Sequence, residues 1–383
     1  MSSTSHSHRT FLSAGGTNGP DAVLGTHVSG RLHRLCDAAG LVDSDERYGH
    51  SLRDLLGPAA ELPLADGPVS ASFVSDDHTP AELSMAFPTG APPSVRVLVE
   101  PGCTAATLAE NGRMGWTALG KLAARWAFSV EPLQRVGDLF FPAAPQGAFA
   151  LWCALELRAS GEPGVKTYVN PLAHGRHHSA QVLQEAMARL GYGSAWPSLL
   201  KYAAPRYPEC DEFLFFAVDL GAWAAPRVKV YVVHRDFSAD GVQSVSGMLR
   251  GGHPQQAREF CRMVGGTEHF NHRPLVSCLA FTEQDTRRPS GYTLHVPVRD
   301  YTDNDQVARD RAASVLRRHG MDPSVLDRAL AAMTERRLAD GSGLISYISL
   351  VQGHRQPPRV TTYFSPEAYR VNPPRGLSQA ERG

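Results

Sequence analysis

Five strand-like stretches of similar character recur along the chain at nearly equal spacing, and this recurrence constrains the fold more than any other feature. In each stretch, β-branched or aromatic residues alternate with polar ones, so that one face is apolar and the other polar. Arg96, Lys166, Lys229, His295 and Tyr363 mark the five stretches. The markers recur at intervals of roughly 65 residues, and a nearly fixed period of this length indicates a repeated supersecondary unit.

A second strand-like stretch precedes each marker strand across a turn rich in glycine and proline. Links such as Arg288-Pro289-Ser290-Gly291 are typical of hairpin connections. The preceding strands are predicted at Glu82–Phe87, Phe149–Leu157, Glu212–Leu220, Val276–Thr282 and Gly343–Val351. The chain therefore predicts five hairpins and ten strands.

Between the hairpins the apolar period changes to that of a helix. Helices are predicted over Thr104–Phe128, Ser179–Leu190, Pro254–Val264, Asn304–His319 and after Asp322-Pro323. An open ten-stranded sheet would leave two edges unpaired, whereas closure removes both. We therefore predict an α+β fold, a closed antiparallel barrel of ten strands with helices outside. Ten strands leave a wider lumen than the roughly eight whose side chains fill a barrel.

Composition excludes several classes of protein. The 383 residues carry 38 Lys plus Arg and 38 Asp plus Glu, so no net charge favours nucleic acid or an anionic membrane. The chain has no run of 18 apolar residues, and its polar start does not resemble a secretory signal. We expect a cytoplasmic protein without a membrane span. Residues 1–22 are expected to be a disordered tail, 23–370 a single barrel, and 371–383 a second tail.

No metal site is predicted. Six scattered cysteines lack a CxxC pair, which favours reduced thiols over zinc. His174, His177 and His178 cluster locally, but no carboxylate or thiolate completes a ligand set, so a solvated loop is favoured. Asp76-Asp77 lacks the further acidic residues of a magnesium motif.

The polar faces of the predicted strands place several cations in one shared space. Such cations are costly to bury unless a multiply charged anion compensates them, and arginine and lysine suit a diphosphate. The accompanying phenols could shield a carbocation and exclude water from it. This combination points to an allylic isoprenoid diphosphate. The alternative is that wall residues pair with Asp or Glu. The cations are Arg96, Lys166, Arg227, Lys229 and Arg359, and the phenols are Tyr168, Tyr231 and Tyr363.

The order and spacing of these residues resemble the dimethylallyltryptophan synthase family of indole prenyltransferases. The resemblance covers about residues 25–370 and is closest to bacterial tryptophan dimethylallyltransferases. It is carried by the five units, by Lys-x-Tyr and Arg-x-Lys-x-Tyr strands, and by Thr79-Pro80-Ala81-Glu82, Leu98-Val99-Glu100-Pro101-Gly102-Cys103 and Gly291-Tyr292-Thr293-Leu294-His295. It implies the αββα (ABBA) prenyltransferase barrel, five αββα repeats around ten strands.

The resemblance also implies roles for individual residues. Glu82 would accept the indole N–H, and Thr293 and His295 stand where many relatives carry Gln-x-Tyr at the diphosphate. The cations named above would hold the diphosphate, and the three tyrosines would cage the allyl cation. Fungal relatives that alkylate indole C4 have a lysine on the strand before the Lys-x-Tyr strand, and Cys153 stands at the corresponding position here. Because a neutral thiol is a poor base, we predict attack at C6, C5 or N1 rather than at C4.

The predicted function is therefore transfer of a dimethylallyl group from dimethylallyl diphosphate to L-tryptophan by electrophilic aromatic substitution. We expect it to need no metal or other cofactor, to serve secondary metabolism, and to act as a monomer or homodimer. One alternative acceptor is another indole or a tryptophan-containing peptide. Alternatives from other classes are a non-catalytic barrel that carries an isoprenoid or phosphate ligand, and a nucleic-acid-binding repeat, which the neutral charge disfavours.

Overall fold

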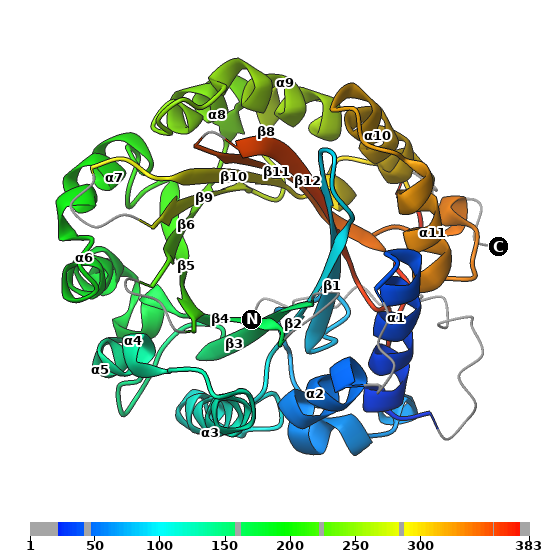
Figure 1. Ribbon diagram of the computed structural model, residues 1–383, viewed down its shortest axis with the longest axis horizontal. Helices are drawn as coiled ribbons and strands as arrows, with labels where there is room; N and C mark the ends of the chain where they lie inside the picture. Colours follow the sequence, from blue (N-terminus) through cyan, green and yellow to red (C-terminus); the bar gives the residue numbers. More distant parts are fainter. Residues whose placement is uncertain are drawn as a thin grey trace, which may run out of the picture.

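The structure is a computed structural model that describes residues 22–41, 47–157, 162–221, 226–282, 287–354 and 356–375. Five consecutive hairpins surround an open lumen (Figure 1). Their strands are β1 (Ala81–Pro88), β2 (Ser94–Val99), β3 (Leu151–Leu157), β4 (Gly164–Val169), β5 (Asp211–Leu220), β6 (Val228–His234), β9 (Leu275–Phe281), β10 (Gly291–Val296), β11 (Ile345–Gly353) and β12 (Gln356–Phe364).

The ten strands form one closed antiparallel barrel in the order β1-β12-β11-β10-β9-β6-β5-β4-β3-β2. Every strand pairs with its neighbours in sequence, and the first and last strands complete the wall through pairs such as Leu83 with Phe364. The closed ten-stranded barrel predicted from the hairpin repeat is confirmed. Because neighbours are antiparallel, the second strands of the five hairpins all run in one direction along the barrel axis.

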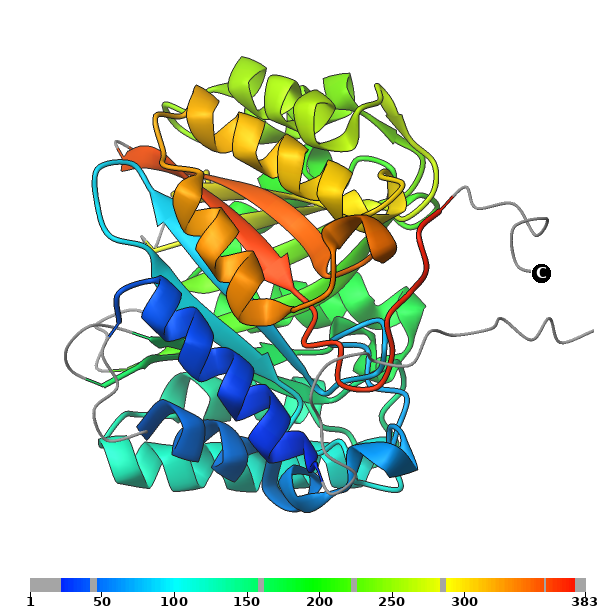
Figure 2. The ribbon, with the colours of Figure 1, turned by 90° about the vertical axis from the view of Figure 1, so that its right-hand side faces the viewer.

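Helices cover the outside of the barrel (Figures 1 and 2). Three of the described helices begin where the sequence provides a capping side chain, since Thr107 accepts from the Glu110 amide, Ser238 from the Gly241 amide and Asn304 from the Val307 amide. The longer helices are α1 (Leu24–Ala38), α2 (Arg47–Leu56), α3 (Leu108–Trp126), α6 (Ser179–Arg189), α7 (Trp196–Tyr202), α8 (Ala239–Ser246), α9 (Pro254–Gly265), α10 (Asp305–Arg318) and α11 (Ser324–Met333). No described helix is long and apolar enough to cross a membrane.

The hydrophobic core lies between the barrel and its helices. The valines of β2 and β6 that alternate with polar residues face outward into this layer and are fully buried, as Val97 and Val230 show. Each such side chain contributes roughly 1.5–3 kcal/mol when removed from water. Packing on the outer face therefore fixes the register, and a slip of one residue would turn every polar side chain away from the lumen.

Several elements were not predicted from the sequence. The chain forms α1 and α2 before the first hairpin, short helices α4 (Glu131–Gln134) and α5 (Gly137–Phe140), and a small outer sheet of β7 (Phe237–Ser238) and β8 (His269–Phe270). Residues 371–375 belong to the expected C-terminal tail, yet Asn372 pairs with Ser342. The expected tail at 1–22 lies, except for residue 22, outside the described residues, as do 376–383.

Candidate active site

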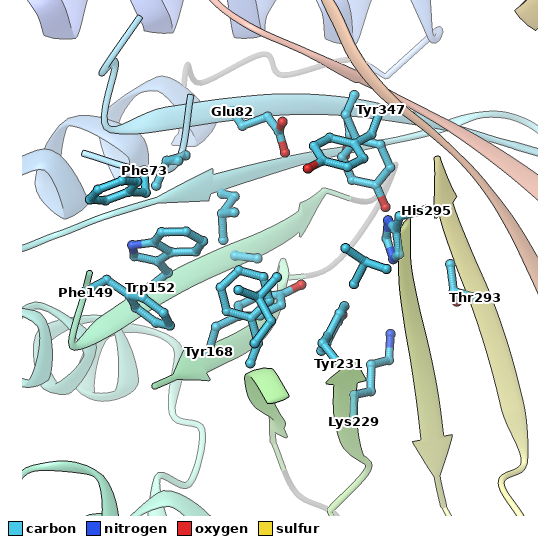
Figure 3. A pocket seen from close by; sticks show the side chains of 18 of the residues that line it. Phe73, Glu82, Phe149, Trp152, Tyr168, Lys229, Tyr231, Thr293, His295 and Tyr347 are labelled. Carbon is cyan, nitrogen blue, oxygen red and sulfur yellow. The ribbon is translucent and has the colours of Figure 1, made fainter. Parts of the chain in front are cut away.

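A cavity of about 350 Å³ occupies the lumen. Its lining includes ten of the eleven predicted site residues, namely Glu82, Arg96, Lys166, Lys229, Thr293, His295, Arg359, Tyr168, Tyr231 and Tyr363. They come from six strands and converge because alternate residues of each strand point inward. Glu82 from the first strand of the barrel and Tyr363 from the last thus face one space. Figure 3 shows Glu82, Tyr231 and His295 around this space.

The basic and the acidic site residues lie at opposite ends of the barrel axis. Arg96, Lys166 and Lys229 lie near the beginnings of the second strands of their hairpins, which all start at the same end of the barrel. Glu82 lies near the beginning of β1, which runs the opposite way. We call the two ends of the lumen the cation end (Arg96, Lys166, Lys229) and the Glu82 end. The aromatic side chains fill the space between them.

Two carboxylates partly neutralise the cation end. Glu156 lies 2.9 Å from Arg96, and Asp219 lies 3.6 Å from Lys166 and also pairs with Arg227. Burial alone would raise the pKa of Glu156, but Arg96 and Lys166 outweigh it and hold that pKa well below its usual range. The predicted cations therefore do meet Asp and Glu partners, as the alternative reading of the sequence supposed.

The neutralisation is incomplete. Five basic side chains, with Lys229 and Arg359 added to the three above, face two carboxylates, which leaves up to three positive charges when all five are protonated. Burial, and then repulsion from Lys166, lowers the pKa of Lys229 well below its ordinary value. Burial and the nearby Arg96 lower the pKa of Arg359 to about 10. This end of the lumen is thus prepared for an anion with several charges.

Arg227 is the predicted site residue that does not line the main cavity. It lines an adjoining cavity of about 390 Å³ together with Glu156 and Asp219. Arg96 and Lys166 border both spaces. Arg227 lies just before β6 and donates from Nε to Asp219 over 2.7 Å. Arg227 is therefore connected to the cation end through Asp219, which also pairs with Lys166.

A continuous aromatic wall separates the two ends of the lumen. The ring centroids of Tyr168 and Tyr231 lie 5.7 Å apart, those of Tyr231 and His295 5.9 Å, and those of His295 and Tyr363 5.5 Å. Burial raises the pKa of all three phenols, so they stay neutral. Neutral π faces directed at one space can stabilise a transient cation.

His295 completes this wall as a neutral ring. Burial, followed by the charges of Lys229 and Arg96, lowers the pKa of its imidazole to about 3. An imidazole that is uncharged at neutral pH can stack and accept a hydrogen bond, but it adds no charge for a diphosphate. Thr293 lines the same cavity from an earlier position on β10.

Glu82 is a carboxyl group held inside the barrel at the end opposite the cations. Its Oε1 accepts a hydrogen bond of 2.8 Å from Ser346, and no ion pair neutralises it among the described residues. Burial raises the pKa of Glu82 to about 7, and the bond from Ser346 offsets part of that effect. The group can therefore accept a hydrogen bond or a proton near neutral pH.

Several lining residues were missed by the sequence reasoning. Trp152 packs against Phe149 with ring centroids 4.4 Å apart and against Phe215 at 5.1 Å. Trp152 and Phe149 extend the aromatic wall toward Phe73 (Figure 3). Trp152 lies directly across the ladder from Tyr168, so pairing β3 with β4 in register would have revealed it. Tyr347 lies near Glu82 in the same view.

A second charged group lies at the Glu82 end. Arg299 pairs with Asp76 at 2.5 Å, and Arg273 pairs with Asp76 at 3.2 Å and Asp300 at 2.6 Å. Asp76, Arg273 and Arg299 all line the main cavity. These residues are far apart in sequence and follow no shared period, so no local pattern identified them.

Cys153 does not face the lumen. Its neighbours Trp152 and Ala154 line the cavity, whereas Cys153 belongs to the core between barrel and helices. Burial raises the pKa of its thiol to about 12. The lumen face of β3 therefore offers an indole and a methyl group near this position, and neither is a base.

The remaining candidates do not form a second site. His174 and His177 lie in short 3-10 helices beside His178, and the described residues contain no group of three potential metal ligands. The six cysteines form no disulfide.

Comparison with known proteins gives a consistent match. The family model for tryptophan dimethylallyltransferase matches residues 46–329. The prenyltransferase PriB is 50% identical in sequence to this chain. Its crystal structure, a ternary complex with L-tryptophan and dimethylallyl thiolodiphosphate, superposes with a TM-score of 0.87, and the match covers 93% of this chain and 99% of the PriB chain. The 5-dimethylallyltryptophan synthase from Streptomyces coelicolor is 47% identical with a TM-score of 0.86, covering 91% and 99%.

A third relative is the 6-dimethylallyltryptophan synthase from Micromonospora olivasterospora, solved in complex with DMASPP and Trp. It is 41% identical with a TM-score of 0.87, and the match covers 92% of this chain and all of that chain. Family model, identity, coverage and TM-score all agree with the barrel fold. The chain belongs to the tryptophan dimethylallyltransferase family.

Proposed function

We propose that this enzyme transfers the dimethylallyl group of dimethylallyl diphosphate to the indole ring of L-tryptophan at C6, C5 or N1. The observation that carries the proposal is the axial order of the lumen, with cations at one end, aromatic rings between, and Glu82 at the other. Solved relatives hold L-tryptophan together with a dimethylallyl thiolodiphosphate, which supports both substrates.

The cation end binds the diphosphate and promotes its departure. Arg96, Lys166 and Lys229 present fixed positive charge where negative charge develops as the allylic carbon–oxygen bond breaks. Arg359 and Arg227 add charge from the wall and from the adjoining cavity. Because side chains supply this neutralisation, the reaction needs no metal ion.

The aromatic wall protects the allyl cation after ionisation. Tyr168, Tyr231 and Tyr363 line the cavity that the cation end also lines, and His295 lies between the rings of Tyr231 and Tyr363. Cation–π attraction lowers the energy of the cation, and the packed rings exclude water that would otherwise trap it. The indole then attacks from the Glu82 end.

Glu82 orients and activates the acceptor. As a carboxylate it accepts the indole N–H, which fixes the ring over the cation and increases its electron density. When a ring carbon is attacked it becomes tetrahedral, and its proton is then lost to a base or water to restore the aromatic ring. The lumen-facing neighbours of Cys153, Trp152 and Ala154, offer no basic group, which supports attack away from C4.

The test is incubation of the purified protein with dimethylallyl diphosphate and L-tryptophan in excess chelator. We expect a mass gain of one C5 unit, with NMR locating the group at C5, C6 or N1. A C4-prenylated product would contradict the regiochemical part of the proposal. Absence of any prenylated product, with chelator or with added Mg²⁺, would contradict the activity itself.

A further inference from the structure

A buried carboxyl group that does not line the cavity lies next to the aromatic wall. Glu100 directly follows β2, which ends at the Glu82 end of the lumen. It is 4% exposed, and the described residues offer it hydrogen bonds but no ion pair. Ser72 donates to one of its oxygens over 2.6 Å, and Asn111 of α3 donates to the other over 2.9 Å. The carboxyl group thus joins β2, α3 and the segment before β1.

Ser72 belongs to a segment without helix or strand, residues 67–80, that borders the lumen. The next two residues, Phe73 and Val74, line the main cavity. Ser72 fixes their backbone, because its Oγ accepts from the Val74 amide over 3.4 Å and its carbonyl oxygen lies 3.0 Å from Nδ1 of His78. Phe73 is 61% exposed although it lines the cavity. The segment therefore lies between the lumen and solvent.

Trp152 is the second link between Glu100 and the lumen. Its indole N–H stabilises the charged form of Glu100, and its buried nitrogen has no other hydrogen-bond partner in the described part of the chain. Trp152 packs with Val74 and Phe149 in one buried cluster. Figure 3 shows Trp152, Phe149 and Phe73 together on one side of the cavity. From outside the cavity, Glu100 thus contacts both the segment and the ring against which the segment packs.

The tightness of this side of the lumen decides which nucleophile meets the allyl cation. When the carbon–oxygen bond of the donor breaks, the diphosphate keeps the electron pair and the C5 unit becomes a cation. Attack by the indole gives prenylated tryptophan. Attack by the oxygen of a water molecule, followed by loss of a proton, gives a C5 alcohol. Because the nearest nucleophile captures such a cation, its transfer to the acceptor needs a wall that excludes water.

We propose that Glu100 is a positioning residue that closes the apolar side of the lumen against water, by holding Ser72 and Trp152 together, and so directs the allyl cation to the acceptor. Hydrogen bonds to a carboxylate are strong enough to fix such a segment. Neither Glu100 nor Ser72 lines the cavity, so both act through the residues that they hold. This inference rests on the proposed function and concerns the fidelity of the transfer.

The test measures the ratio of C5 alcohol to prenylated tryptophan formed from dimethylallyl diphosphate at saturating L-tryptophan. Both products come from the same active molecules, so the ratio does not depend on how much of a preparation is folded. Glu100→Ala removes every contact of the carboxylate, and Ser72→Ala removes only the contact with the segment. We expect the ratio to rise roughly tenfold in Glu100→Ala and by a smaller factor in Ser72→Ala, since a hydrogen bond to a charged group has about this value.

Thr107→Ala is the matched control. The Thr107 side chain caps α3, the helix that carries Asn111, so its loss destabilises this helix without removing a contact of Glu100. This variant should have a lower Tm and the ratio of the wild type. A ratio that rises as much in Thr107→Ala as in Glu100→Ala would contradict the proposal, because general loosening would then account for the hydrolysis.

The outcomes separate this inference from the proposed function. If the wild-type enzyme forms no prenylated tryptophan, the function fails. If the wild type prenylates L-tryptophan and the ratio stays unchanged in Glu100→Ala and Ser72→Ala, the function stands and the inference fails. Should Glu100→Ala not fold, Ser72→Ala decides alone, and an unchanged ratio in that variant overturns the inference.

Discussion

At the scale of single residues, the Glu82 carboxyl group couples pH to activity. Its pKa of about 7 means that the acceptor form is lost as the pH falls below neutrality. We predict that kcat/KM for L-tryptophan rises with pH through about 7. Glu82→Gln should lose this rise and reduce kcat roughly a hundredfold, a typical value for a general base. A pH–rate profile of both proteins measures this, and an unchanged profile in Glu82→Gln would contradict the role.

The raised pKa of Glu82 also makes the free energy of unfolding depend on pH. The pKa of Glu82 is raised in the folded state, so stability is lost as the pH rises from about 4.5 through about 7. Glu82→Gln removes that loss and should raise the free energy of unfolding at pH 8 by up to roughly 3 kcal/mol. Urea unfolding at pH 5 and pH 8 tests it, because the gain should appear mainly at the higher pH.

Lys229 offers a second prediction at this scale. Burial and repulsion from Lys166 lower its pKa, and a bound diphosphate would raise it. Binding of inorganic pyrophosphate should therefore take up protons, which calorimetry in two buffers of different ionisation enthalpy measures. Lys229→Ala should take up fewer protons and reduce kcat at least a hundredfold, with little change in the dissociation constant of L-tryptophan. Equal proton uptake in the variant would show that another group titrates.

At the scale of strands, the register of β4, β5 and β6 places Asp219 between two cations. Asp219 stands directly across the ladder from Lys166 and pairs with Arg227. Without ligand, Asp219→Asn should lower the free energy of unfolding by roughly 3 kcal/mol, because buried charges lose their partner. Pyrophosphate should then bind more tightly and raise Tm more than in the wild type. A variant that is less stable and also binds pyrophosphate more weakly would contradict this account.

The strands also explain what the sequence could and could not predict. Arg96, Lys166 and Tyr363 were identifiable because alternation with outward-facing apolar residues leaves little choice of face. Phe215 was not, since a bulge between Phe213 and Phe215 breaks the period of two. Helices α1 and α2 lie outside the repeating hairpin pattern and give no such signal.

At the scale of the whole molecule, prediction from sequence reached its limit at contacts between distant segments. The barrel brings Asp76 to Arg299, and no periodicity links an aspartate before the first strand to an arginine after β10. The sequence predicted that Asp or Glu could pair with the cations, but it did not identify Glu156 and Asp219, because these pairs depend on the register between neighbouring strands. These pairings follow from the register of the closed barrel, and the alternation of apolar and polar residues within one strand does not specify them.

The pairing of β1 with β12 has a consequence for how the protein is made. The ribosome releases Glu82 before Tyr363, and until β12 has emerged, β1 and β11 each lack one hydrogen-bonding neighbour. From the release of β1 to the release of β12, the nascent chain therefore has unpaired strand edges, and chaperones would protect it from aggregation during this interval. The active site is therefore complete only after β12 has paired with β1, because Tyr363 and Arg359 come from β12.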